Sequence, residues 1–233
     1  MKKNYEMDMC SGPILGKLLT FTIPLIFSGI LQLLFNAADV IVVGRFAGSQ
    51  SLAAVGSTTA LINLMINIFI GLSVGVNVIV ARYYGAKREK DVQDTIHTAM
   101  ALSIVSGLFL IVVGQLLSRP MLELMGTPDD VIDKSTIYMR IIFIGMPANM
   151  IYNFGSAILR AVGDTKRPLY FLTAAGVINV VLNLFFVIMF QMDVAGGALA
   201  TAISQAISAC LVILCLMESE GGLKLHLKAL KIH

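Results

Sequence analysis

The sequence contains few charged residues. Asp, Glu, Lys and Arg make up 13% of the 233 residues, about half of the roughly 25% that is typical of soluble domains. Hydrophobic side chains make up 57%, which leaves too few polar groups to cover a globule in water. The same composition excludes a disordered chain, and a net charge of +3 does not indicate a nucleic-acid binder. We therefore expect an integral membrane protein in contact with the lipid bilayer, without a nucleic-acid partner.

Motifs for catalysis and for cross-linking are also missing. The three cysteines are an odd number and give no disulfide framework. The sequence has neither a phosphate-binding Gly-x-x-x-x-Gly-Lys loop nor a His-Glu-x-x-His metal motif. Asp129, Asp130 and Asp133 are more simply explained as charges at a helix start than as a catalytic set. We expect no enzyme activity and no cofactor, so any pumping must draw on an ion gradient.

Charge-free stretches predict the number of membrane spans, because a helix needs about 20 apolar residues to cross the hydrocarbon core. Their lengths suit α-helices rather than the shorter, alternating strands of a β-barrel. The prediction is an all-α bundle of six transmembrane helices, with the stretches Leu18–Ala38, Phe46–Ala81, Thr95–Ser118, Ile141–Leu159, Pro168–Met192 and Val194–Met217.

Lysine and arginine indicate the orientation of the bundle. Most of them fall in segments that face the cytoplasm if the N-terminus is inside, which is the arrangement that the positive-inside rule favours. Six spans then place both termini in the cytoplasm. No apolar stretch of the kind found in signal peptides precedes Cys10. We expect a multi-pass protein of the cell's inner (cytoplasmic) membrane.

The sequence divides into three parts on this reading. Residues 1–14 form a cytoplasmic N-terminal lead, residues 15–217 the six-helix lobe, and residues 218–233 a basic cytoplasmic tail or a truncated linker. In the tail, Lys224, Lys228 and Lys231 have helical spacing beside leucines. Such a helix would lie on the anionic inner leaflet.

Polar side chains recur inside the predicted spans, where they are costly and often functional. In four of the six stretches they repeat at intervals that place them on one helix face. One such stripe is explained by hydrogen bonds between helices, whereas four indicate a shared wet cavity. The predicted lining residues are Gln32, Asn36, Asn63, Asn67, Asn149, Asn153 and Ser156.

Asp39 is the only acidic residue well inside a predicted span. Counting from the span ends at about 1.5 Å per residue places Asp39, Asn183 and Thr201 at a common depth, roughly 9–14 Å below the outer surface. With Asn179 included, these residues offer a carboxylate, two amide oxygens and a hydroxyl. Together they can bind Na⁺, or Asp39 can carry a proton instead. The alternative is a carboxylate that is hydrogen-bonded only for packing.

Two prolines, Pro24 and Pro147, lie inside predicted spans. Each removes a backbone hydrogen bond and kinks its helix. Such a kink is either static or a hinge for movement.

Several segments resemble the multidrug and toxic compound extrusion (MATE) transporters. The resemblance covers nearly the whole chain, in order, and corresponds to the N-terminal six-helix lobe of that family. It is carried by Ile23-Pro24, the Asp39 segment ending in Val43-Gly44-Arg45, Leu124–Asp130, Tyr138–Ile141, Ala157–Pro168 and Gly196–Gln205.

The resemblance implies an antiporter that exports organic, often cationic, compounds in exchange for Na⁺ or H⁺ by alternating access. It also implies a cation site at Asp39, Asn179, Asn183 and Thr201. Many relatives carry an acid where this chain has Asn183, which leaves the coupling ion, Na⁺ or H⁺, undecided.

Length departs from the family pattern of twelve helices in two lobes. Either the chain is a truncated product that lacks its partner lobe, which we favour, or it works as a homodimer. Two other functions stay open. A flippase for lipid-linked precursors, from a related superfamily, would have a more cationic cavity. A non-transporting remnant would tolerate changes at Asp39 with some loss of stability at most.

Overall fold

The computed structural model describes Met7 and residues 12–226, and the regular elements in this part of the chain are all helical. Seven α-helices, one π-helix (η1) and one short 3₁₀-helix (η2) follow one another along the chain. Their bounds are α1 Ile14–Phe46, α2 Ser49–Gly85, α3 Glu89–Leu124, α4 Asp129–Ile144, α5 Met146–Ala161, α6 Lys166–Leu184, η1 Phe185–Met189, α7 Asp193–Glu218 and η2 Gly221–Leu223.

Six membrane spans are present if α4 and α5 are counted as one. Five helices are long and apolar enough to cross a bilayer on their own, α6 being continued by η1, and α4 and α5 pass the same test as a pair bent by 48°. The predicted six-helix bundle is therefore confirmed. The fourth span begins at Asp129, where the acidic residues indicated a helix start, and the charge-free stretch Ile141–Leu159 is only its later part; Arg140 therefore lies inside a helix, with its side chain exposed on the surface.

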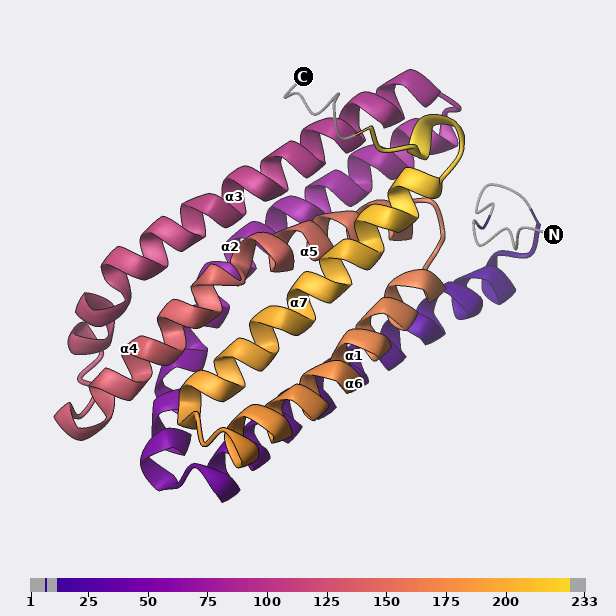
Figure 1. The fold of residues 1–233 in the computed structure, drawn as a ribbon. Helices are drawn as coiled ribbons and strands as arrows, with labels where there is room; N and C mark the ends of the chain where they lie inside the picture. The colour runs from indigo at the N-terminus through magenta and orange to yellow at the C-terminus, as the bar shows by residue number, and fades with distance from the viewer. Residues whose placement is uncertain (1–6, 8–11, 227–233) are drawn as a thin grey trace.

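The helices form an elongated bundle (Figure 1). In it α2, α3, α4 and α5 lie on one side of α7, and α6 and α1 lie on the other. The start of α1 and the end of α7 are at the same end of the bundle, as an even number of spans requires. Which end faces the cytoplasm stays a prediction; we call the other end, where α1 ends and α7 begins, the predicted outer end.

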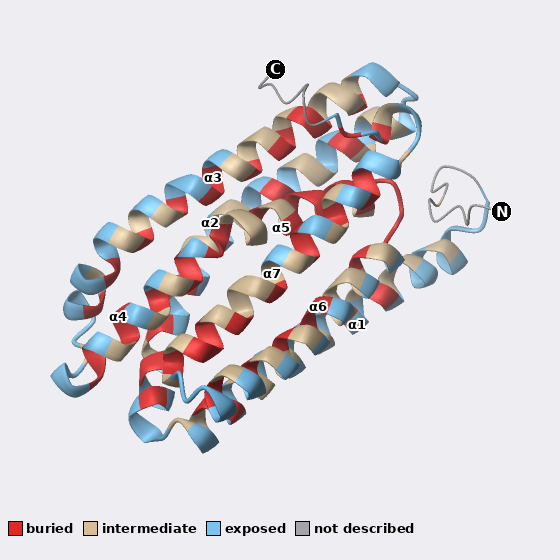
Figure 2. Cartoon of the chain, viewed as in Figure 1, coloured by how far each residue is buried: buried red, intermediate tan, exposed pale blue. Residues whose placement is uncertain are grey.

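Burial is uneven among the helices. Nine of the 16 residues of α5 are buried, because it packs against α2, α3 and α7 at once. Phe154 and Ile158 on its inner face are fully buried. By contrast, α1 buries only four of its 33 residues (Figure 2). Many of its exposed side chains are large and apolar. Apolar side chains of this kind suit contact with lipid or with another membrane helix.

The bend between α4 and α5 occurs at Gly145, two residues before Pro147. Proline has no N–H to donate to the carbonyl four residues earlier, so the helix cannot continue straight. This confirms a break near Pro147. Pro24, in contrast, lies within α1, which continues through it as one helix, and a kink there stays a prediction.

Glycines on α3 allow this helix to approach the bend closely. A Cβ atom at Gly107 would lie 2.3 Å from the Cα of Pro147, and one at Gly114 would lie 2.1 Å from Cγ of Phe143. Real Cβ atoms do not approach other atoms this closely, so only glycine fits at either position without movement. The contact at Gly107 is with backbone, which cannot rotate away as a side chain can.

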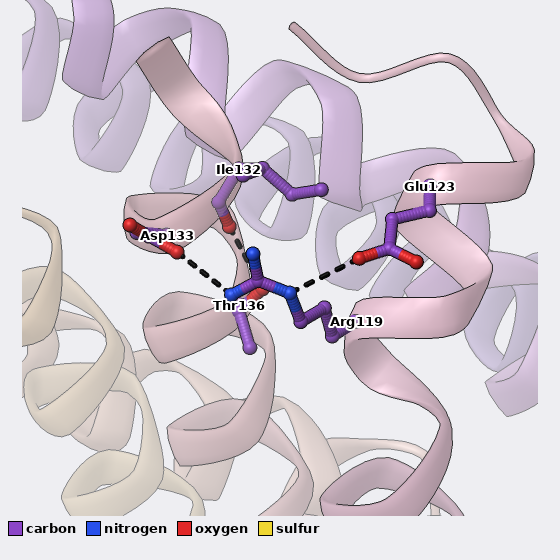
Figure 3. A network of polar contacts seen from close by, with 5 residues as sticks. All are labelled: Arg119, Glu123, Ile132, Asp133 and Thr136. Carbon is purple, nitrogen blue, oxygen red and sulfur yellow. Dashed lines mark hydrogen bonds and ion pairs between the residues drawn. The ribbon is translucent and has the colours of Figure 1, made fainter. Parts of the chain in front are cut away.

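An arginine links α3 to α4 at the predicted outer end. Figure 3 shows the Arg119 guanidinium between the carboxylates of Glu123 and Asp133, at N–O distances of 3.0 and 2.9 Å. All three side chains are more than half exposed, so these ion pairs contribute little to stability. Their effect is to orient the turn that joins the two helices.

After α7 the chain folds back onto α3. Leu223 and Leu225 are buried, and the Leu225 N–H donates to the Leu216 carbonyl at 3.0 Å. Lys224 has extended backbone angles and the leucines on either side are buried, so this part of the tail is not helical. Whether the tail is a basic cytoplasmic segment or a linker stays a prediction. Lys228 and Lys231 lie outside the described residues.

The close approach at Gly107 predicts a marked stability difference between two glycine substitutions. Gly107→Ala should lower the free energy of unfolding by about 1–3 kcal/mol, the usual cost of overpacking. Gly71→Ala is the control, since a Cβ there would meet nothing within 4 Å. Thermal unfolding of the purified protein in detergent checks both. Equal midpoints for the two variants would show that α3 and α5 are not in backbone contact.

Candidate cation site

The four residues predicted to bind a cation come from three neighbouring helices. Asp39 lies on α1, Asn179 and Asn183 lie one turn apart on α6, and Thr201 lies on α7. The helix α1 approaches α6 closely because Gly176 leaves room for the Phe35 ring: a Cβ atom there would lie 1.9 Å from Cε2 of Phe35. This contact lies one turn from Asp39 along α1 and sets the separation of the two helices.

Asp39 and Asn183 are in direct contact. The Asn183 amide Nδ2 donates to Oδ1 of Asp39 at 2.7 Å, and Asn183 is fully buried. A carboxylate can only accept, so this contact fixes the Asn183 amide with its nitrogen toward Asp39 and its oxygen elsewhere. The common depth predicted for Asp39, Asn183 and Thr201 agrees with this contact and with those of Asn179 described next.

Asn179 is oriented by two hydroxyl groups on α7. Its Nδ2 lies 3.2 Å from Oγ1 of Thr201 and 3.4 Å from Oγ of Ser204. The Ser204 hydroxyl donates its proton to the Thr201 carbonyl, and the Thr201 hydroxyl has the Gly197 carbonyl and the Asp39 carboxylate as acceptors. Both hydroxyls therefore accept from the Asn179 amide. The amide nitrogen of Asn179 must face α7, and its oxygen points away.

Two amide oxygens are left without donors by this arrangement. Oδ1 of Asn179 and Oδ1 of Asn183 are both buried, and neither has a hydrogen-bond partner among the described residues. Leaving a buried acceptor unpaired costs about 1–3 kcal/mol. Amide oxygens and a carboxylate are the kinds of ligand that small, hard cations take, so these residues are candidates for a cation site.

Two residues that were not predicted from the sequence also adjoin the site. Ser204 is the second hydroxyl that orients Asn179. Tyr138 on α4 lies near enough to interact electrostatically with Asp39. Ser204 was detectable as a hydroxyl three residues from Thr201 on one helix face. Tyr138 carried no such signal, because the tertiary fold sets its position relative to Asp39.

The seven predicted cavity-lining residues fall into two groups. The buried or partly buried group lies on α5 and consists of Asn149, Asn153 and Ser156. Nδ2 of Asn153 donates to Oδ1 of Asn149 at 2.7 Å. The Ser156 hydroxyl has no partner among the described residues. Their role, and that of the others, in lining a substrate cavity stays a prediction. The exposed group lies on α1 and α2 and consists of Gln32, Asn36, Asn63 and Asn67.

The sequence matches a known protein family and several transporters. The MatE family model matches residues 24–185. A probable multidrug resistance protein of Bacillus subtilis, YoeA, is 35% identical over 208 residues, which are 88% of this chain and 45% of the relative. A FAD transporter of Shewanella oneidensis is 27% identical over 86% of this chain and 45% of its own length. The chain thus spans about half the length of these curated relatives.

A solved structure shows the same fold. The crystal structure of MATE in the bent conformation superposes with a TM-score of 0.85 and covers 92% of this chain and 48% of that one. The two sequences are 24% identical, so this likeness concerns the fold alone.

The contact between Asp39 and Asn183 predicts an interaction energy that can be measured. Asp39→Asn and Asn183→Leu, made singly and together, should be non-additive by about 1.5–3 kcal/mol, the range for a hydrogen bond to a charged group. Unfolding of the purified protein in mixed micelles gives the four free energies. Effects that add to within about 0.5 kcal/mol would mean that the two side chains do not interact.

Proposed function

Because the chain belongs to the MatE family of multidrug and toxic compound extrusion transporters, we propose that it forms a six-helix half of a secondary antiporter. This half exports small organic compounds in exchange for a cation that binds at Asp39. The observation that carries the proposal is the pair of unpartnered amide oxygens beside the Asp39 carboxylate. A site used only for packing would be expected to pair them.

The ligand set favours Na⁺ over H⁺ as the coupling ion. A proton on Asp39 would neutralise the carboxylate, but it supplies one donor for two unpaired oxygens. A Na⁺ ion takes several oxygen ligands at once, so it would satisfy both Asn179 and Asn183 together with Asp39. The hydroxyl of Thr201 adds a further oxygen beside them.

The exported compound is proposed from the relatives and from the exposed polar residues. YoeA is named as a probable multidrug resistance protein. The exposed polar side chains of α1 and α2, Gln32, Asn36, Asn63 and Asn67, are neutral amides, which accept a cationic compound without repelling it. We therefore propose organic cations as substrates. One relative is named a FAD transporter. FAD, an anionic flavin, is therefore the substrate with which the cationic compound is compared.

A second six-helix unit completes the proposed transporter. Four amide side chains exposed on α1 and α2 would be costly against lipid. A facing unit would give these side chains a wet cavity between two halves. Since α1 starts and α7 ends at one end of the bundle, another copy or a second lobe can pack in the same orientation.

Efflux of a cationic dye tests the role of Asp39. In cells without their own efflux pumps, ethidium accumulation is compared between wild type, Asp39→Asn and Asp133→Asn. Asp39→Asn should reduce Na⁺-driven efflux to background, because the site loses its charge. Asp133→Asn is the matched control, since that carboxylate is 78% exposed and pairs with Arg119 rather than with a residue of the site.

Both variants must reach the membrane in wild-type amounts. Efflux by Asp39→Asn at the wild-type rate would refute the proposal, and export of FAD in place of ethidium would refute the cationic substrate. If the chain expressed alone gives no efflux, the comparison is repeated with a partner half supplied.

A further inference from the structure

A cavity of about 340 Å³ lies at the predicted outer end of the bundle. It is formed where α1 ends, η1 ends and α7 begins. The exposed side chains of Phe46, Ile188 and Gln191 show that it opens on the surface. Its wall consists of Phe46, Ala47, Val187, Ile188, Gln191 and Asp193.

The wall on α1 continues the helix face that carries Asp39. Residues four and seven apart share one face of an α-helix. Val43 and Phe46 follow Asp39 at these intervals, so Phe46 lies about 10 Å outward of the carboxylate. The cavity is therefore aligned with the site along this helix.

The other two helices show the same alignment. Val187 follows Asn183 by four residues, at the point where α6 becomes the π-helix η1. Gly197 and Asp193 precede Thr201 on α7 by four and eight residues. All three helices that form the cation site thus extend their site-bearing faces outward to the cavity.

One apolar layer separates the cavity from the site. Val43 and Val187 are 2% and 4% exposed; Val43 lies between Asp39 and Phe46 along α1, and Val187, in the cavity wall, follows Asn183 by one turn. Gly197 completes the layer, since a Cβ atom there would lie 3.2 Å from Cγ2 of Val43 and 3.6 Å from Oδ1 of Asn183. The unpartnered oxygen of Asn183 therefore faces this layer.

The mouth of the cavity is polar and its charges are balanced. Oδ2 of Asp193 pairs with Nζ of Lys134 at 2.7 Å, and Lys134 also donates to Ser51 at 3.1 Å. The Ser51 hydroxyl donates to the other oxygen of Asp193. Because Lys134 offsets the Asp193 charge, a cation can pass this point without being trapped there.

We propose that this cavity is the outer vestibule through which a hydrated Na⁺ ion reaches Asp39. The oxygens of Gln191 and Asp193 replace part of the water shell, and Oδ1 of Asn183 is the next ligand after the Val43–Val187 layer. The proposal rests on the proposed function, since it supplies the path to that cation site. The competing path enters from the partly exposed side of Asp39.

A barrier between vestibule and site predicts a particular kinetic signature. Val187→Ala should thin the apolar layer and raise the rates of Na⁺ binding and release by the same factor, at least about threefold, with an unchanged Kd. The Kd is unchanged because a barrier affects both directions equally. Gly197→Ala should slow both rates, since its methyl group would press on Val43.

The measurement is ²³Na NMR on the purified full chain, in which a titration gives the Kd and exchange broadening gives the residence time. Val177→Ala on α6 is the matched control, because Val177 is 54% exposed and is not part of the cavity wall. Unchanged rates in both Val187→Ala and Gly197→Ala, with Na⁺ binding that still needs Asp39, would overturn the vestibule and leave the cation site standing. A changed Kd, with only one of the two rates altered, would also overturn it. Na⁺ binding that survives Asp39→Asn would instead overturn the proposed function.

Discussion

A carboxylate inside a bilayer is the constraint around which this lobe is organised. Asp39 lies in the body of α1, where its charge is costly unless other groups compensate. The protein supplies the compensation from α6 and α7, through the amide of Asn183 and the hydroxyls that orient Asn179. The three helices must therefore keep a fixed register, since a slip of one residue would separate these groups.

Small residues provide that register. Gly176 admits the Phe35 ring between α1 and α6, and Gly197 leaves space between α7 and Val43. On the other side of α7, Gly107 lets α3 touch the backbone at the α4–α5 bend. In a membrane the hydrophobic effect does not drive helices together, so close packing at small residues takes its place. The same glycines set the distances on which the ligand geometry depends.

Much of this was predictable from the sequence. Charge-free stretches predicted six spans because lipid tolerates few charges, and residue counting along helices placed Asp39, Asn183 and Thr201 at one depth. The break near Pro147 followed from its missing N–H. The acidic residues Asp129 and Asp130 indicated a helix start, which the structure has at Asp129, although Arg140 interrupts the apolar run of this span. In the tail, the spacing of the lysines did not show that Leu223 and Leu225 are buried, because tertiary contacts hold them.

Other features depend on pairing between helices and carry no local signal. Tyr138 reaches Asp39 only through the packing of α4. The orientation of the Asn179 amide depends on where the protons of Thr201 and Ser204 are already used. The π-helix at Phe185–Met189 follows Asn183 directly, and π-helical turns often mark functional sites.

The measurement that tests the central claim most directly is the thermal midpoint of the purified chain in NaCl, compared with equal choline chloride. A ligand that binds only the folded state stabilises it by about 2.7 kcal/mol at one hundred times its Kd. The account predicts a higher midpoint in Na⁺ for the wild type and for Asp133→Asn, and no Na⁺ effect for Asp39→Asn. Equal midpoints in Na⁺ and choline for the wild type, over the full range of concentration, would contradict it.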